Sequence, residues 1–354
     1  MCEAPSSNHI QGKIIDLSEA VGTVLAHDMT EVRPGEFKGA AFRKGHVVTK
    51  EDLDHLARMG KRHLYVLDIS DDMMHEDEAA LVLAESLAGP NVSFSKAPCE
   101  GKLNLLADCD GLLKVNGNAL IEFNMVEGVM CASRHSDTIV KKGDVLAGTR
   151  AIPLVIGRDV VARAAEVGQS VGYIFEVKPL ARPKTALVIT GNEVYNKLIE
   201  DKFADVMRPK LAAFDCPVMD ETFAPDDADL IARAISDQLD KGAELVILTG
   251  GMSVDPDDVT RHGLALAGAE DIIYGTAVLP GAMLMVARIG EVPVIGTPAC
   301  ALYHPRTMFD LVLPKILAGE RVSRRDLAAM GHGGMCLNCP TCRYPVCPFG
   351  KGAN

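Results

Sequence analysis

The second half of the chain alternates continuous apolar runs with segments that carry apolar residues at helical spacing. The runs at 185–190, 244–249 and 292–295 have the length and composition typical of strands buried on both faces. Segments 202–214 and 229–239 carry the helical spacing. Because strands that alternate with helices form parallel sheets with right-handed crossovers, we expect an α/β domain with a doubly wound, mostly parallel sheet.

The first half of the chain mixes short strand signals with helical ones. Helical patterns occur at 50–59, 71–89 and 157–168, and strand patterns occur at 64–67, 112–115, 119–123 and 145–155. Asn116-Gly117, between two of these strands, is typical of a β-hairpin turn. Prolines at 179 and 183 mark the boundary with the second half. We therefore predict an N-terminal mixed α/β region (1–90), a β-rich subdomain with a linker helix (91–181), the α/β domain (182–320) and a cysteine-rich tail (321–354).

Composition and charge narrow the class of protein. The chain has 354 residues, of which 48% are hydrophobic and 24% charged, as in ordinary globular proteins. Its formal net charge of −12 argues against nucleic acid as a partner, because phosphate backbones require a basic surface. No apolar run approaches the roughly 20 residues of a membrane span. Met1–Gly12 lacks a secretory signal pattern, so we expect a cytoplasmic protein with reduced cysteines.

Three glycine-containing turns follow the predicted strands, at 190–193, 249–253 and 296–298. Ligands of open parallel sheets bind outside the carboxyl ends of the strands. Glycines let backbone N–H groups approach an anion, and a Ser or Thr hydroxyl adds a donor. Three such turns at one edge therefore predict a site for a small phosphate-bearing anion. The alternative is a set of tight turns that bind no ligand.

Carboxylates stand beside these turns, among them Glu193, Asp226 and Asp258. Carboxylates repel a phosphate unless a cation lies between them, so their presence predicts Mg²⁺ bridging the ligand and the protein. N-capping is the competing explanation for Asp226, which follows Pro225 and precedes a predicted helix. Asp258 could also open a helix.

Residues 185–319 resemble the molybdopterin-binding domain of the molybdenum cofactor biosynthesis proteins, which include molybdopterin adenylyltransferases and molybdenumtransferases. The resemblance rests on Val-Ile-Thr-Gly-Asn-Glu-Val at 188–194, on Pro-Asp-Asp at 225–227, and on Leu-Thr-Gly-Gly-Met-Ser-Val-Asp-Pro-Asp-Asp-Val-Thr at 248–260. Segment 20–28 is similar to the entry segment of the molybdenumtransferases, and segment 42–66 is similar to a segment that those enzymes carry before their binding domain.

The resemblance implies a site and a reaction. It implies that molybdopterin is bound by Thr190, Gly191, Thr249, Gly250, Gly251, Ser253, Pro280, Gly281, Gly296 and Pro298. It implies that Asp258, Glu193 and Asp226 act in catalysis, with Mg²⁺ stabilising charge as an adenylated pterin is cleaved and molybdate is inserted. The partners would then be the pterin and molybdate or tungstate.

The chain departs from the family pattern at four positions. Asn192 replaces an aspartate, Phe203 replaces an asparagine, and Ala282 replaces a lysine. The Gly-Asn-Pro turn of the family becomes Pro298-Ala299-Cys300. The missing lysine removes a cation from an anion site, and a charge-assisted hydrogen bond contributes about 1.5–3 kcal/mol. These departures favour a non-catalytic cofactor carrier or chaperone for a molybdoenzyme, whereas the retained acids favour a molybdenumtransferase-like enzyme. A pyrophosphate hydrolase and a homo-oligomer also stay open.

Four of the ten cysteines crowd into the tail, at Cys336, Cys339, Cys342 and Cys347, with a proline after the last. In a reduced compartment such spacing indicates a metal site rather than disulfides. Three cysteines spaced by two resemble an iron–sulfur ligand run, although the usual last gap is three residues. Tetrahedral thiolates suit Zn²⁺ equally. An iron–sulfur cluster, Zn²⁺ and a metal-free, redox-sensitive tail are the three alternatives.

Overall fold

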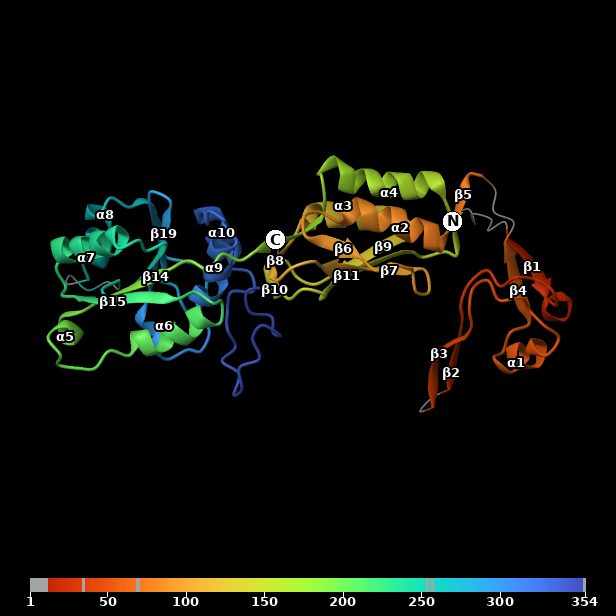
Figure 1. The fold of residues 1–354 in the computed structure, drawn as a ribbon, viewed down its shortest axis with the longest axis horizontal. Helices are drawn as coiled ribbons and strands as arrows, with labels where there is room; N and C mark the ends of the chain where they lie inside the picture. Colours follow the sequence, from red (N-terminus) through yellow and green to blue (C-terminus); the bar gives the residue numbers. More distant parts are fainter. Residues whose placement is uncertain (1–11, 34–35, 68–70, 253–254, 256–257, 353–354) are drawn as a thin grey trace, which may run out of the picture. The chain divides into compact units, whose positions relative to one another are not determined.

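The computed structural model describes residues 12–33, 36–67, 71–252, 255 and 258–352. The chain divides into two compact units, and it passes between them more than once (Figure 1). The first unit comprises 1–108, 115–134 and 142–176, and the second comprises 109–114, 135–141 and 177–354. In the part of the chain that the structure describes, no helix combines the length and the apolar character that a bilayer crossing needs.

The first unit begins with two antiparallel strand pairs and a short helix. Strand β1 (Gly12–Asp16) pairs with β4 (His63–Leu67), and β2 (Met29–Arg33) pairs with β3 (Phe37–Phe42). The 3-10 helix η1 (Leu17–Glu19) and helix α1 (Asp52–Arg58) belong to the same part of the chain. Their buried side chains, including Leu25, Val48 and Leu56, form a small core of their own.

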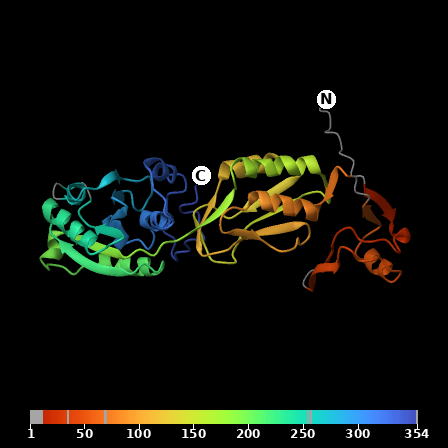
Figure 2. The same cartoon turned by 45° about the horizontal axis from the view of Figure 1, so that its top comes forward.

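The rest of the first unit is a helix layer on an antiparallel sheet. The sheet has the order β6 (Val92–Phe94), β7 (Lys102–Ala107), β11 (Val145–Ala151), β9 (Val129–Ser133). Helices α2 (Glu76–Leu87), α3 (Gly117–Met125) and α4 (Arg158–Ser170) lie on one face of it (Figures 1 and 2). A short pair, β5 (Met73–His75) with β12 (Val155–Gly157), adjoins α2 and α4 in sequence. The strand predicted at 119–123 was wrong, because these residues belong to α3.

A second small sheet lies mostly in the second unit. Its order is β10 (Thr138–Val140), β8 (Gly111–Val115), β13 (Phe175–Pro179). Asp137, before β10, forms ion pairs with Lys114 and Lys315, whose side chains are largely buried. The pKa of the Asp137 carboxyl is lowered: burial raises it, but the nearby Lys315 and Lys114 ammonium groups outweigh that effect.

The main sheet of the second unit has six strands, in the order β15 (Val218–Ala224), β14 (Thr185–Thr190), β16 (Leu245–Thr249), β19 (Val292–Thr297), β18 (Met285–Ile289), β17 (Glu270–Tyr274). The first four run parallel to one another, β18 runs antiparallel to β19, and β17 runs antiparallel to β18. The accompanying helices are α5 (Asn192–Tyr195), α6 (Phe203–Ala212), α7 (Ala228–Asp240), α8 (Thr260–Leu266), η2 (Ala299–Leu302), α9 (Met308–Leu317) and α10 (Arg324–Ala329). The predicted doubly wound, mostly parallel sheet is confirmed.

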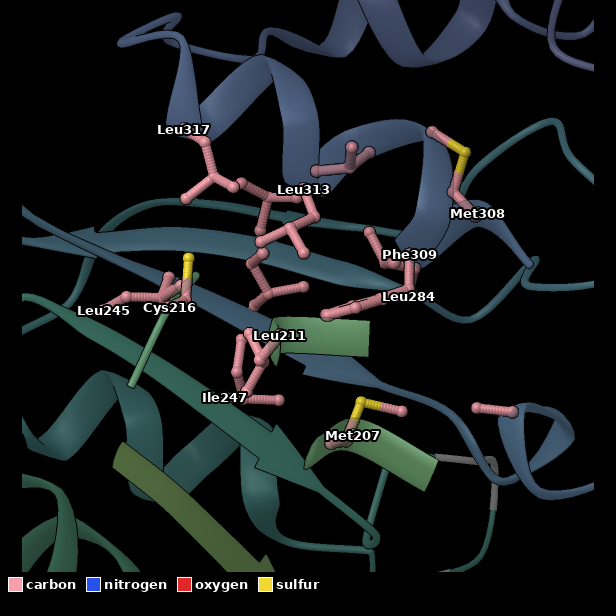
Figure 3. Close-up of a cluster of buried hydrophobic side chains, with 14 of the residues drawn as sticks. Met207, Leu211, Cys216, Leu245, Ile247, Leu284, Met308, Phe309, Leu313 and Leu317 are labelled. Atoms are coloured by element: carbon pink, nitrogen blue, oxygen red, sulfur yellow. The ribbon is translucent and has the colours of Figure 1, made fainter. Parts of the chain in front are cut away.

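Helices cover both faces of this sheet, as the apolar pattern of its strands requires. Alternate residues of each buried strand point to opposite faces. One face packs against α6 and α9 through Leu187, Ile189, Leu245, Ile247 and Ile295, and Figure 3 shows part of this core. The other face packs against α7 and α8 through Ala186, Val188, Val246, Leu248 and Val294.

The tail contributes to the first of these two cores. Leu327 of α10 is fully buried, and Phe349 is 3% exposed within the same cluster as α9. The side chains of Tyr344 and Cys347 pack against that cluster. The tail is therefore anchored to the α/β domain by apolar contacts.

Candidate functional site

Each of the three central parallel strands ends in a buried threonine. Thr190 ends β14, Thr249 ends β16 and Thr297 ends β19, and Thr249 is the register partner of Thr297. The Thr190 hydroxyl donates to the Thr249 carbonyl oxygen at 3.0 Å. It also lies 2.9 Å from the hydroxyl of Thr260, the first residue of α8. The first two predicted turns therefore meet at the carboxyl edge of the sheet.

Two of these threonines have a buried hydroxyl group with no hydrogen-bond partner among the described residues. Among the described residues, no hydrogen-bond partner exists for the buried Oγ1 atoms of Thr249 and Thr297. Both residues are 0% exposed. A buried hydroxyl without a partner carries a desolvation cost of about 1–3 kcal/mol. The edge thus presents two adjacent polar groups that a ligand or an ordered water could satisfy.

The Gly250-Gly251 turn is built so that side chains do not fit. Gly250 has φ +88°, and a Cβ there would lie 2.3 Å from the Thr190 carbonyl oxygen. Gly251 has φ +58°, and its Cβ would lie 2.2 Å from the Thr260 hydroxyl oxygen. Left-handed backbone and close packing both select glycine. The turn therefore keeps its backbone close to the threonine cluster.

The other predicted glycines are also closely packed. Gly191 has φ +138°, and a Cβ at Gly296 would lie 2.4 Å from the Met252 sulfur. Gly281 has φ +119°, and its Cβ would lie 2.7 Å from the Met308 backbone nitrogen. That nitrogen donates to the Pro280 carbonyl oxygen at 3.0 Å, so this turn is tied to the start of α9.

The third turn ends at Pro298, which is buried and precedes η2. Its carbonyl oxygen accepts from the Ala301 N–H at 3.0 Å. Burial raises the pKa of the nearby Cys300 thiol, so this group is uncharged at neutral pH. A neutral thiol at this position neither attracts nor repels an anion strongly.

Asp226 is joined to the first turn and does not cap a helix. Its Oδ2 accepts from the Asn192 backbone N–H at 2.9 Å, and its own N–H donates to the Asn192 side-chain oxygen at 3.1 Å. The capping residue of α7 is Asp227, which accepts from the Leu230 N–H. Asp226 therefore holds the two loops together, and its predicted catalytic role stays a prediction.

The other two predicted acids differ in their surroundings. Glu193 is exposed on α5. Asp258 is half-buried, and within the described ranges its Oδ2 is buried without a hydrogen-bond partner. Ser253 lies outside the described residues. Among the described residues, no three His, Cys, Asp or Glu side chains come together as a metal ion would require. The predicted Mg²⁺ would therefore have Asp258 as its protein ligand and would take its other ligands from the bound molecule.

The four tail cysteines line a single cavity of about 330 Å³. His304, Arg306 and Arg343 line it as well. Cys339 and Cys342 are exposed, whereas Cys336 and Cys347 are half-buried. Their predicted role as metal ligands stays a prediction.

Sequence reasoning missed a cavity of about 420 Å³ elsewhere in the second unit. None of the predicted ligand-binding residues lines it. Its wall includes Asp310, whose carboxylate accepts from Lys210 at 2.6 and 2.7 Å and from Arg306 at 2.8 Å. Burial lowers the pKa of the Lys210 ammonium, although Asp310 opposes this shift. No sequence motif marks these residues, because they meet only in the fold.

Residues 186–318 match the family described as "Probable molybdopterin binding domain", and residues 14–68 match a family described as a domain of unknown function. The chain is 32% identical over 82 residues to a CinA-like protein of Amoebophilus asiaticus, covering 23% of this chain and 20% of that protein. It is 38% identical over 85 residues to a CinA-like protein of Frankia casuarinae, covering 24% of this chain and 19% of that one. The chain thus spans about a fifth of the length of these relatives.

Among solved structures, the molybdopterin biosynthesis enzyme MoaB of Thermus thermophilus aligns with 39% of this chain and 98% of its own, at 16% identity and a TM-score of 0.34. The family match covers all three turns and the strands that precede them. Residues 186–318 are therefore similar in sequence to the probable molybdopterin binding domain that this family model describes.

Proposed function

We propose that the carboxyl edge of the main sheet binds the phosphate of a molybdopterin, and that the protein acts in the assembly of a molybdenum or tungsten cofactor. The observation that supports this proposal is a pair of buried hydroxyls, those of Thr249 and Thr297, which have no hydrogen-bond partner among the described residues and lie on strands that end side by side. Hydroxyls and glycine N–H groups are donors suited to phosphate oxygens. The Gly250-Gly251 turn brings its backbone to the same cluster.

Asp258 is the best-placed ligand for Mg²⁺ in this proposal. Its Oδ2 is buried and, within the described residues, lacks a hydrogen-bond partner. A buried carboxylate oxygen without a partner is unfavourable, and a cation would compensate it. Mg²⁺ in proteins is commonly held by one or two carboxylates together with substrate phosphates. When bound, the ion would neutralise charge on the phosphate oxygens of an adenylated pterin, and Asp258 would orient it.

Two observations favour weak catalysis and a carrier function over a fully active molybdenumtransferase. The Asp226 carboxylate is hydrogen-bonded to the Asn192 backbone, so at least one of its oxygens is engaged within the protein. Ala282 supplies no cation at the position where the resembling family has a lysine. The second candidate function is therefore a cofactor carrier that delivers to a molybdo- or tungstoenzyme.

Binding is tested first, by titration of the full chain with molybdopterin. Replacing both Thr249 and Thr297 with Val keeps their shape and removes the two hydroxyls. We expect the affinity to fall at least about tenfold, which corresponds to about 1.4 kcal/mol. Thr138→Val is the matched control, because Thr138 lies on β10 in the other small sheet and its hydroxyl donates to the His135 carbonyl oxygen. Equal affinity in all three proteins would place the ligand elsewhere.

Catalysis is tested by AMP release from adenylated molybdopterin with molybdate and Mg²⁺. We expect slow release or none, and Asp258→Asn should abolish any release because an amide binds Mg²⁺ poorly. Rapid release by the wild-type chain would instead establish the transferase function. Hydrolysis of ADP-ribose at a comparable rate would indicate a pyrophosphate hydrolase.

A further inference from the structure

The cavity of about 420 Å³ lies within the second unit, to which all of its lining residues belong. Leu180 and Arg182 line it and precede β14, and Ala213 lines it between α6 and β15. These two strands run parallel, so their amino ends lie opposite the carboxyl ends at which the candidate site is built. Small-molecule sites usually have volumes of about 300–1,000 Å³. The cavity is therefore separate from the candidate site and large enough for a small organic molecule.

Basic side chains outnumber acidic ones around this cavity, six to four, although the whole chain has a net charge of −12. Three of the basic side chains each form an ion pair with one of these acids: Lys141 with Asp110, Arg182 with Asp215, and Lys315 with Asp137. The fourth acid, Asp310, pairs with both Lys210 and Arg306. Within the described residues, Lys351 forms no ion pair. The wall of the cavity therefore carries two more positive charges than negative ones.

The ion pairs of Asp310 are buried. The side chains of Lys210 and Asp310 are 10% and 4% exposed. The Lys210 ammonium donates to both carboxylate oxygens of Asp310 and to the Pro305 carbonyl oxygen, which uses its three N–H groups. The charge of Asp310 is thus balanced by Lys210, and the charge of Arg306 has no acid of its own. A cation removed from water without a counterion is unfavourable, and an anion in the cavity would compensate it.

Arg306 and Lys351 contact the same two residues of the tail. The Arg306 guanidinium carbon lies 5.0 Å from the centre of the Tyr344 ring, and the Lys351 ammonium donates to the carbonyl oxygen of Pro345, the next residue. Among the described residues, the Arg306 guanidinium makes one hydrogen bond, from Nη1 to Asp310 at 2.8 Å. A guanidinium has five N–H donors, so Arg306 has others to offer a ligand.

Apolar side chains form much of the remaining wall, among them Phe214, Phe309, Leu311 and Phe349. The Tyr344 ring belongs to the same wall. Burial raises the pKa of the Tyr344 phenol to about 12, so this ring adds no negative charge at neutral pH. The cavity thus combines two cations with an aromatic surface, and aromatic rings pack favourably against one another.

We propose that this cavity binds a small organic dianion with an aromatic body, and that Arg306 and Lys351 bind its charged group. The planar guanidinium of arginine suits the paired oxygens of a phosphate or carboxylate. The aromatic body would pack against the Tyr344 and Phe309 side of the wall. This ligand is additional to the phosphate that the carboxyl ends of the strands are proposed to bind.

The experiment titrates the full chain with phenyl phosphate by isothermal titration calorimetry, at constant ionic strength. The pH is kept above the second pKa of a phosphate monoester, about 6, so that the probe is a dianion. The chain carries both Thr249→Val and Thr297→Val, which remove the hydroxyls proposed to bind phosphate at the carboxyl edge. We expect saturable binding, and inorganic phosphate should bind at least about tenfold more weakly because it lacks the aromatic body.

Charge variants made in the same chain identify the binding residues. Arg306→Gln and Lys351→Gln should each weaken phenyl phosphate binding at least about fivefold. Lys241→Gln is the matched control, because it removes the same charge from the second unit but Lys241 pairs with Asp220 and does not line the cavity. Near-ultraviolet circular dichroism checks that each variant is folded.

Three results would overturn the proposal. The first is no saturable binding of phenyl phosphate to the Thr249→Val, Thr297→Val chain, and binding to the wild-type chain alone would then place the probe at the carboxyl edge. The second is an affinity that neither Arg306→Gln nor Lys351→Gln changes. The third is equal affinity for inorganic phosphate and phenyl phosphate, which would exclude a site for an aromatic body.

Discussion

Gly250 and Gly242 share the same left-handed backbone angle, φ +88°, but have different surroundings. A Cβ at Gly250 would lie 2.3 Å from the Thr190 carbonyl oxygen, whereas nothing lies within 4 Å of one at Gly242. Alanine at either position adopts a strained backbone, at a cost of about 1–2 kcal/mol. We expect Gly250→Ala to lower the free energy of unfolding by about 1–3 kcal/mol more than Gly242→Ala, because it also overpacks the turn. Urea denaturation measures this difference, and equal losses would show that the turn has spare room.

Asp52 gives a residue-level prediction for pH. Its carboxylate lies 2.8 Å from the His46 ring nitrogen and accepts from the Thr49 N–H. These hydrogen bonds lower the pKa of the Asp52 carboxyl to about 2, and the one with His46 has the largest effect. A carboxyl whose folded pKa is depressed stabilises the fold above its unfolded pKa, which is about 3.9. That stabilisation is lost as pH falls from about 4 towards 2. Asp52→Asn should therefore lower the melting temperature at pH 6 but not at pH 2. A constant difference between the two proteins at both pH values would contradict the lowered pKa.

Most residues of the candidate site could be identified from the sequence, but the contacts between them could not be predicted. Threonine ends two of the predicted strands, at 190 and 249, and a third threonine, Thr297, follows the predicted strand 292–295 by two residues, so this repeated pattern could have been recognised as a row of hydroxyls. The contact between Thr190 and Thr260 joins residues 70 apart in sequence and depends on how α8 packs. Likewise, only the fold distinguishes Asp226, which joins two loops, from Asp227, which caps α7.

At the scale of elements, the buried parallel strands and amphipathic helices of the second unit were predictable, because a six-residue apolar run and a helical stripe are strong signals. The strand predicted at 119–123 was wrong for a specific reason. Asn116-Gly117 favours a tight hairpin, but the Asn116 side chain instead accepts from the Ala119 N–H at 3.1 Å and caps α3. Asn is among the best residues for both tasks, so the dipeptide alone does not decide between them.

Helix α3 supplies the corresponding prediction. Asn116→Ala removes the only side-chain cap described for this helix and should lower the free energy of unfolding by about 1 kcal/mol. Asn118→Ala is the control, since Asn118 is exposed two residues further along and Ala favours helix. If both substitutions had the same effect on the urea midpoint, the capping bond would contribute nothing to stability.

At the scale of the whole molecule, the chain combines two units whose unfolding should be separable. Each has its own buried cores, and domains with separate cores can unfold as separate units. The division of the chain was predicted from its composition. That composition, rich in cysteine and glycine in the tail, did not indicate that the tail packs against a core. Phe349, a single apolar residue in that tail, is nevertheless buried with α9. A lone buried aromatic in a loop segment leaves no periodic signal to detect.

Phe349→Ala tests whether the tail stabilises the α/β domain. Removing a buried phenylalanine costs about 3–5 kcal/mol, so the variant should lower the calorimetric transition of the second unit by many degrees. Val346→Ala is the matched control in the same tail, because Val346 is 82% exposed and its truncation should change stability by less than about 0.5 kcal/mol. Asn116→Ala identifies the other transition, since α3 lies in the first unit. The transition that Asn116→Ala does not change is then that of the second unit. If Phe349→Ala also left this transition unchanged, the tail would contribute nothing to the core in which Phe349 is buried.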